Sequence, residues 1–559
     1  MGALDRLIRR NLFLIPAVFF CAAVAVGPYA EAATLNVTLR VKNNLSVPRV
    51  GEPVTSGVPI PESIGLMSAN DVSLLGSDGL PVPLQAVPLA WWGGGPDDGN
   101  RPIRWLLLDF QADVPIHGMA TYRLTTGEAS TPPPHPVTVT DAGNGVTIDT
   151  GAGTFTISRE DGSLSGPGLA SPVRPALTDS GGVRRYPDGP VTISTVMSGP
   201  LRASIHVAGS FPDTGGGKLD FTARWWFYAG TSTARLFITL ENNTPSPLFE
   251  YGQIDCYDIH SDGSVTFADF SLVTTGDVGS GLSYLVAGSD ANPFPWTSPT
   301  GRGGGPSSGT LTEKVVLYQD SSGTDDWDHY VTFLDWDGNP LDTRPRMQAY
   351  VGFRGYIITE GGGTVAAGDH SGGWLAVSGD RGTLTACVVD FWESFPKALR
   401  ALPSGTVEIG LFPDEFASGI GGGSGYLHTL RPGEHKTHEV VLAFSPGGAS
   451  PPDGDALCAP LFAAASPAWY VASGAAGLTA RGAGTTTGQQ NVTLSVAELP
   501  PHSHEYADRY GTPKNHTWGA YGVANNDVRD DTRKTAIAGS GEAHNNVQPS
   551  AYVFFIIKQ

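Results

Sequence analysis

Hydrophobic and polar residues alternate in short runs along most of the chain. Residues 34–41 (TLNVTLRV) alternate strictly, and the same period of two returns in residues 153–157 (GTFTI) and 236–240 (LFITL). Residues 104–110 (RWLLLDF) form a heavier, more continuous apolar run. Successive side chains of a β-strand point to opposite faces of the sheet, so these runs predict strands with at least one buried face.

Glycine and proline separate these runs. The chain has 73 Gly and 44 Pro among 559 residues, which exceeds ordinary usage and shows no collagen repeat. Many short strands joined by tight turns are typical of sandwiches and barrels, so the expected fold class is all-β. Residues 391–402 (FWESFPKALRAL) are the best candidate for a single short helix.

Changes in composition divide the chain into parts. Residues 33–130 predict a small N-terminal β-barrel, which ends in the Thr/Pro-rich residues 127–136, because proline lacks the N–H that a sheet ladder requires. Residues 137–477 keep the strand pattern over a length that suits a large β-sandwich. Residues 478–559 are richer in small polar side chains and predict an extended, intertwined tip.

The N-terminus has the order of a secretory signal peptide. Three arginines within the first ten residues precede an apolar run over residues 12–26, and the small residues of Ala-Glu-Ala at 30–32 follow as a cleavage site. The apolar run is short for a bilayer span of about 20 residues. We therefore expect residues 1–32 to be removed, giving a secreted or cell-surface protein with no membrane span in the mature chain.

The net charge bears on which partners the protein can bind, and the cysteine content bears on whether disulfides stabilise it. The formal net charge of −20 repels phosphate backbones, so nucleic acid is not an expected partner. Removal of the signal peptide leaves Cys256, Cys387 and Cys458. An odd number of widely spaced cysteines is not a disulfide framework, and the sequence leaves open one bridge or three buried thiols.

Several motifs in the front part occur in a recognisable order. Residues 51–54 (GEPV), 57–61 (GVPIP) and 81–85 (PVPLQ) precede the run at 104–110. Together these motifs resemble the N-terminal RIFT-type β-barrel of exo-acting rhamnogalacturonan lyases. The resemblance continues through the sandwich of that family and covers residues 45–477. The motifs there are Tyr228-Ala229-Gly230, Leu240-Glu241-Asn242, Gly373-Trp374, Phe391-Trp392, Phe395-Pro396-Lys397 and Pro467-Ala468-Trp469-Tyr470.

The family's catalytic part has no counterpart here. In those lyases a large α/α-barrel follows the sandwich and helps to build the cleft, whereas residues 478–559 show no helical periodicity. The resemblance therefore implies a carbohydrate-associated β scaffold. β-Elimination would need a base and a group that neutralises the carboxylate. Tyr356, His329, Lys397 and Arg400 are candidates, but their spacing does not bring them together, so we assign no catalytic residue.

Two stretches suggest binding sites. Residues 258–269 (DIHSDGSVTFAD) have the spacing of a calcium loop, although a hairpin turn at Asp262-Gly263 explains them better, because the following residues alternate as a strand. Aromatic rings beside carboxylates can form a sugar-binding face. The candidates for that face are Trp91, Trp92, Trp327, Asp328 and Trp336. The alternative interpretation of these residues is a hairpin with tryptophans in the core.

The tail carries a second resemblance. Residues 494–504 (LSVAELPPHSH) and, near the C-terminus, 544–549 (HNNVQP) resemble the tip of phage tail-collar and short tail-fibre proteins. His502 and His504 are two apart, so on an extended strand both imidazoles point the same way. Three chains would supply six imidazoles to one axis, which suits an octahedral first-row metal such as iron. Two exposed histidines on a polar loop are the alternative.

These features predict a secreted homotrimer that binds a polysaccharide or cell-surface glycan, with adhesin-like character. An active rhamnogalacturonan-type lyase is a second interpretation, and the missing barrel disfavours it. A phage tail-like receptor-binding fibre is a third. The signal peptide disfavours that interpretation, because phage particles assemble in the cytoplasm.

Overall fold

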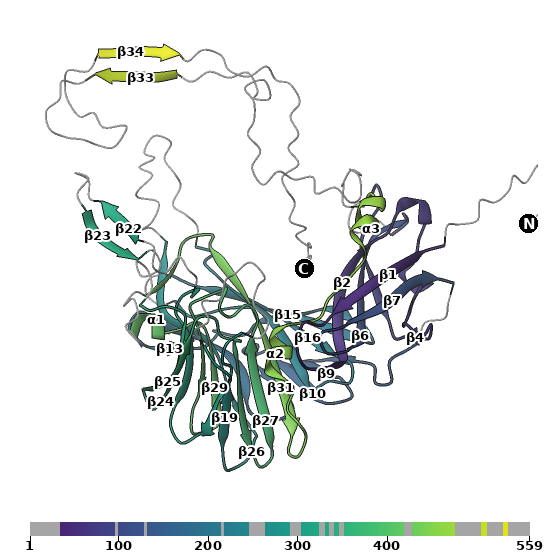
Figure 1. The fold of residues 1–559 in the computed structure, drawn as a ribbon, viewed down its shortest axis with the longest axis horizontal. Helices are drawn as coiled ribbons and strands as arrows, with labels where there is room; N and C mark the ends of the chain where they lie inside the picture. Colours follow the sequence, from purple (N-terminus) through teal and green to yellow (C-terminus); the bar gives the residue numbers. More distant parts are fainter. Residues whose placement is uncertain are drawn as a thin grey trace, which may run out of the picture.

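The computed structural model describes residues 34–94, 99–127, 131–213, 217–244, 263–290, 303–323, 352–418 and 427–475, together with four strands at 330–334, 340–345, 505–510 and 529–534. Strands dominate these ranges, which confirms the all-β prediction (Figure 1). Within them, no helix combines the length and the apolarity needed to cross a bilayer.

Two small sheets enclose the core of the N-terminal unit, drawn purple to blue in Figure 1. The first sheet has the order β32 (Ala463–Ala464), β1 (Asn36–Lys42), β7 (Met119–Thr126), β3 (Val72–Leu75) and β4 (Pro81–Val82). The second has β2 (Arg49–Pro59), β6 (Ile103–Val114) and β5 (Gln85–Trp91). Two 3₁₀ turns, η1 (Glu62–Ile64) and η2 (Ala69–Asp71), lie between β2 and β3. Burial alternates along β1 as its sequence predicts.

Two large sheets form the predicted sandwich. The first has the order β25 (Gly363–Gly368), β24 (Tyr356–Glu360), β21 (Val315–Gln319), β28 (Lys397–Ala401), β29 (Thr406–Phe412), β18 (Val265–Gly276), β12 (Leu169–Asp179), β11 (Leu164–Ser165), β10 (Thr154–Ser158), β9 (Gly145–Asp149) and β8 (Thr138–Ala142). In addition, β13 (Arg184–Arg185) pairs with β12, and β30 (His428–Leu430) pairs with β18.

The second large sheet has the order β14 (Thr192–Ser198), β15 (Arg202–Ser210), β16 (Asp220–Tyr228), β17 (Thr233–Glu241), β31 (His435–Pro446), β27 (Gly382–Val388), β26 (Trp374–Gly379), β19 (Ser283–Val286) and β20 (Ser307–Thr310). Inward-facing side chains of both sheets, such as Phe227, Leu399 and Val440, fill one hydrophobic core. This face-to-face packing buries the apolar half of each alternating strand.

The remaining elements are short. Two further pairs of strands are antiparallel: β22 (Tyr330–Leu334) with β23 (Pro340–Pro345), and β33 (Glu505–Tyr510) with β34 (Arg529–Lys534). The helices are α1 (Glu415–Ser418), α2 (Gly454–Cys458) and α3 (Pro467–Ala472). Cys387 of β27 and Cys458 of α2 form a disulfide. Of the two alternatives that the sequence left open, one bridge or three buried thiols, the structure therefore has the bridge.

After the sandwich the chain returns to the N-terminal unit. Val41 pairs with Ala463, and the Arg49 guanidinium donates to the carbonyls of Ala456 and Ala459 at 2.8 and 3.0 Å. Figure 1 shows α3 lying against the N-terminal strands. One strand of the first sheet therefore comes from a segment that follows the whole sandwich along the chain.

The helix predicted for residues 391–402 is wrong. Residues 391–394 form a turn and Lys397–Ala401 form β28, every residue of which is buried. Pro396 cannot donate a helical hydrogen bond, and the residue before a proline avoids helical geometry. A strand covered on both faces also lacks alternation, so its sequence does not distinguish it from a buried helix.

Candidate functional site

The segment from Phe391 to Ala401 supplies side chains to three polar clusters. Its turn carries Trp392 and Glu393, and its strand β28 carries Lys397 and Arg400. Neighbouring residues of a strand face opposite sides of the sheet. Leu399 points into the sandwich core, so Lys397 shares the inner face with it, while Arg400 lies on the outer face.

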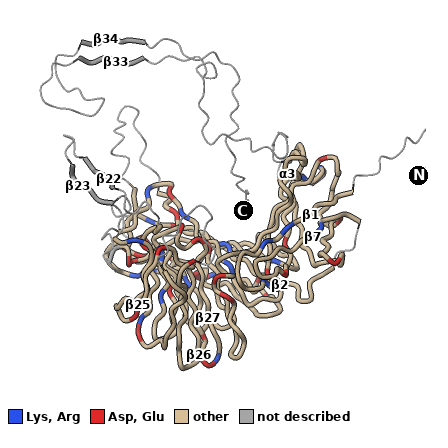
Figure 2. The backbone as a smooth tube through the Cα atoms, in the orientation of Figure 1, with Lys and Arg blue, Asp and Glu red and all other residues tan. Residues whose placement is uncertain are grey.

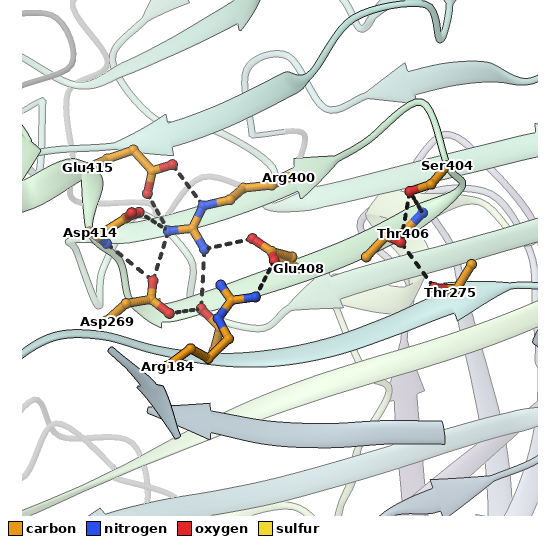
Figure 3. Close-up of polar contacts among 10 residues, drawn as sticks. Arg184, Asp269, Thr275, Arg400, Ser404, Thr406, Glu408, Asp414 and Glu415 are labelled. Atoms are coloured by element: carbon orange, nitrogen blue, oxygen red, sulfur yellow. Dashed lines mark hydrogen bonds and ion pairs between the residues drawn. The ribbon is translucent and has the colours of Figure 1, made fainter. Parts of the chain in front are cut away.

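Carboxylates surround Arg400 (Figure 3), whose side chain is 1% exposed. Its Nε donates to Glu415 Oε1 at 2.7 Å, and its Nη2 donates to Asp269 Oδ1 at 2.9 Å and to Asp414 Oδ1 at 2.6 Å. Its Nη1 donates to Ser271 Oγ at 3.2 Å. Every nitrogen of the guanidinium is therefore engaged within the protein.

A glycine makes room for this arrangement. Gly410 of β29 pairs with Ala398 on one side and with Ser271 on the other, between Arg400 and the carboxylate of Asp269. A Cβ atom at Gly410 would lie 3.3 Å from Arg400 Nη2 and 3.0 Å from Pro413 Cβ. A side chain at this position would crowd the guanidinium where it crosses β29, so the glycine gives it room.

Acidic and basic residues are interspersed over the described backbone (Figure 2), but the cluster around Arg400 holds more acids than one arginine can neutralise (Figure 3). Burial raises the pKa of Asp414 to about 6, against the opposing charge of Arg400. Burial also opposes ionisation of Glu415, but the charge and hydrogen bonds of Arg400 outweigh it and hold that pKa below its usual value. Glu408 Oε2 lies 3.5 Å from Arg400 Nη1, and Glu408 Oε1 lies 2.8 Å from Arg184 Nη1. The arrangement suits a structural ion cluster.

A second cluster lies on the inner face, around the half-buried ring of Phe412. The ring centres of His428 and His438 are 5.3 and 5.2 Å from that of Phe412. The Nζ atoms of Lys397 and Lys436 are 5.9 and 6.0 Å from it. Burial and the neighbouring Lys436 hold the pKa of Lys397 well below its usual range, and burial lowers the pKa of His428 to about 4.

A third cluster lies at the turn itself. His370 and Trp392 stack with ring centres 3.9 Å apart at 17°, and the indole N–H of Trp392 donates to Asp290 Oδ2 at 3.0 Å. Desolvation of its carboxyl group, with Asp390 and Asp290 nearby, raises the pKa of Glu393 to about 7. These residues come from distant segments, and of them only Trp392 belongs to a motif noted in the sequence, Phe391-Trp392.

Among the described residues, no contact joins the groups considered for β-elimination. Arg400 and Lys397 face opposite sides of β28, and the donors of Arg400 are occupied. Tyr356 is 1% exposed in the sandwich core on β24. His329 lies outside the described residues.

Trp91 and Trp92 are half-buried at the end of β5. Trp91 packs against the core of the N-terminal unit. The indole N–H of Trp92 donates to the carbonyl of Ile60 at 3.0 Å, and the guanidinium carbon of Arg104 lies 5.2 Å from the centre of the Trp92 ring. Trp327, Asp328, Trp336, His502 and His504 lie outside the described residues.

The returning helix α3 adds further aromatic rings beside this pair. The indole N–H of Trp469 donates to the carbonyl of Pro59 at 2.8 Å, next to the Ile60 carbonyl that Trp92 uses. Tyr470 lies 6.5 Å from Trp105 of β6, ring centre to ring centre. We call Trp91, Trp92, Trp105, Trp469 and Tyr470 the aromatic surface. All five residues are half-buried.

The calcium-like stretch is described only from Gly263 onward. Asp269, its final acid, is 2% exposed and bound to Arg400. Across the described ranges, no three His, Cys, Asp or Glu side chains gather closely enough to hold a metal ion. The histidine pair expected to bind metal is not part of those ranges.

Comparisons with known proteins give distant matches. No protein-family model matches the chain, and no curated protein does. Among solved structures, an alpha-mannosidase from Enterococcus faecalis V583 matches with a TM-score of 0.39 and 12% identity, over 77% of this chain and 46% of that one. A glycosyl hydrolase family 38 protein from Enterococcus faecalis gives 0.38 and 12%, over 77% and 47%.

A galactose 1-epimerase from Lactobacillus acidophilus NCFM matches with a TM-score of 0.27 and 10% identity, over 56% of this chain and 98% of that one. The alpha-mannosidase and the family 38 protein are longer, and this chain spans less than half the length of each. At these identities and TM-scores the likeness assigns neither a family nor a substrate.

Proposed function

We propose that the protein is secreted and binds a polysaccharide or cell-surface glycan, in the manner of an adhesin. The observation that carries this proposal is the aromatic surface of the N-terminal unit. Half-buried rings offer flat apolar faces that can stack on the C–H faces of sugars. Arg104 lies beside Trp92, and its Nε donates to the carbonyl of Ala475 at 2.8 Å, so it connects the returning segment to these rings.

The disulfide supports secretion. Bridges persist in oxidising compartments and are rare in the cytosol. Cys387 and Cys458 are 71 residues apart, and their bridge connects the sandwich to the segment that returns to the N-terminal unit. It therefore stabilises the path that brings α3 to the aromatic surface.

We also propose that residues 478–559 trimerise the protein. The strands β33 and β34 form a two-stranded sheet, and such a sheet alone is marginally stable in water. Two further copies would supply pairing partners and buried surface. His502 and His504 directly precede β33, so three chains could bring six imidazoles to a common axis, where a first-row metal could bind.

Of the groups considered for β-elimination, Arg400 is not available to a substrate. A lyase needs a free cation or acid to neutralise the substrate carboxylate. The N–H groups of Arg400 already donate to Glu415, Asp269 and Asp414. The proposal therefore expects no unsaturated product from rhamnogalacturonan, and a continuous rise in absorbance near 235 nm, roughly the unsaturated uronate band, would contradict it.

The test is a glycan array followed by titration of the retained glycan. Replacing Trp92 or Trp91 by alanine should weaken binding about tenfold, which corresponds to one lost stacking contact. Tyr186→Ala is the matched control, because Tyr186 is an exposed aromatic residue on the sandwich, 38% exposed. The proposal fails if the wild-type protein retains no glycan, or if both folded tryptophan variants bind as well as the control.

A further inference from the structure

Lys397, which is buried, and Lys436, which is half-buried, share one hydrogen-bond acceptor. Lys397 Nζ donates to the carbonyl of Ser394 at 2.5 Å and to that of Pro396 at 3.0 Å. Lys436 Nζ reaches the same Ser394 carbonyl at 3.3 Å. An ammonium group has three N–H donors, so among the described residues these bonds leave one donor on Lys397 and two on Lys436 without a partner.

No carboxylate in the described part of the chain compensates this pair. Within the described part of the chain, neither Lys397 nor Lys436 forms an ion pair with an acid, and no acid contributes to their electrostatic surroundings. The charge of Asp269 acts to raise the pKa of the adjoining His428, against the larger effect of burial. The Asp269 carboxylate itself accepts a hydrogen bond from Arg400. Two like charges close together and without an acidic partner are costly where they lose hydration, which Lys397 does fully and Lys436 in part.

His438 adds an unpaired polar atom at the same place. Its side chain is 4% exposed, and its Nε2 has no hydrogen-bond partner among the described residues. Lys397 and Lys436 are both near enough to lower the pKa of His438, together with burial. Leaving a buried donor or acceptor unpaired costs about 1–3 kcal/mol, so such a group needs an explanation.

The cluster reaches solvent at one side. Lys436, at the start of β31, and Phe412, at the end of β29, are both half-buried. The Phe412 ring lies at similar distance from both amines and from His438. A small group that approaches beside Phe412 would come to the Lys436 amine first, since Lys397 is 1% exposed.

We propose that Lys397, Lys436 and His438 form a binding site for one small oxyanion, with Phe412 as its apolar wall. The oxyanion is a carboxylate, sulfate or phosphate group, free or carried by a sugar acid. It would accept hydrogen bonds from both ammonium groups and give the buried charges a counter-charge. The site lies in the sandwich, away from the aromatic surface, and does not depend on the proposed glycan binding.

The experiment is a titration of the full-length protein with sodium sulfate, phosphate, acetate and gluconate, at constant ionic strength set with chloride. Calorimetry should detect saturable binding of at least one of these anions, and the melting temperature should rise with its concentration by mass action. Lys436→Gln should weaken that binding at least tenfold. Lys42→Gln is the matched control, since Lys42 is an exposed lysine on β1.

The outcomes separate the sources of the anion. Tighter binding of gluconate than of the inorganic anions assigns the site to a sugar acid, and the reverse order assigns it to a free oxyanion. Absence of saturable binding by all four anions overturns the proposal, as does a folded Lys436→Gln variant with unchanged affinity. Anion binding without any glycan binding would leave this site standing and refute the glycan-binding role alone.

Discussion

Arg202 and Asp109 form a buried ion pair that joins the sandwich to the N-terminal unit. Arg202 Nε lies 2.7 Å from Asp109 Oδ1, and each side chain is 2% exposed. The guanidinium carbon also lies 4.2 Å from the centre of the Trp226 ring. The two units are therefore coupled by a contact that contains a desolvated charge on each side.

Removing one partner of this pair should destabilise the protein strongly. Asp109→Ala leaves the Arg202 guanidinium buried without its carboxylate, which costs about 3 kcal/mol of unfolding free energy. Denaturant titration measures the loss. Asp141→Ala is the control, because its ion pair with Arg159 is exposed and should contribute less than about 1 kcal/mol. Equal effects of the two substitutions would contradict the proposed coupling.

Gly410→Ala tests the crossing of Arg400 over β29. The added methyl group would press on Arg400 Nη2 and on Pro413, so the free energy of unfolding should fall by about 1–2 kcal/mol. Gly143→Ala is a matched control, since a Cβ there meets nothing within 4 Å. Thermal melting of both variants decides the question, and a Gly410→Ala variant as stable as the control would disprove the crowding.

The raised pKa of Asp414 predicts a pH dependence with a definite sign. Because this pKa is about 6 in the folded protein, against an ordinary value of 3.8, the folded form holds a proton that the unfolded chain releases between these values. This group's contribution to stability is therefore complete below pH 3.8 and is lost as the pH rises through 6. Asp414 is 54% exposed, so solvent screening reduces the effect.

The measurement is the unfolding free energy of Asp414→Asn and wild-type protein from below pH 6 to above it. The variant cannot take up the proton, so its stability relative to wild type should increase as the pH rises through that value. A constant difference across this range would show that the Asp414 carboxyl titrates normally.

The proposed metal site at His502 and His504 predicts how residues 478–559 associate. The wild-type protein should sediment as a trimer that carries one metal ion per three chains. Replacing His502 and His504 by alanine should abolish the bound metal and weaken the trimer, while the front units keep their melting transition. A wild-type monomer would refute the trimer. A trimer purified without chelators and free of metal would refute only the ligand assignment.

Sequence reasoning identified the strands whose alternation is a local property. In β1 and β17 every second side chain is apolar, and burial follows the same period in the structure. This period is written in neighbouring residues, so it needs no knowledge of distant segments. The same holds for the all-β class, which rests on many such runs separated by glycine and proline.

The clusters required the tertiary structure. Arg400 meets Asp269, which lies 131 residues away, and Cys387 meets Cys458 across 71. The side chains around β28 come from strands that are neighbours in the sheet but distant along the chain. The hydrophobic periodicity of the sequence does not show which strands are neighbours. β28 itself was mistaken for a helix because it is buried on both faces. Periodicity reports which face of an element is covered, whereas the partners that cover it depend on the packing of the whole chain.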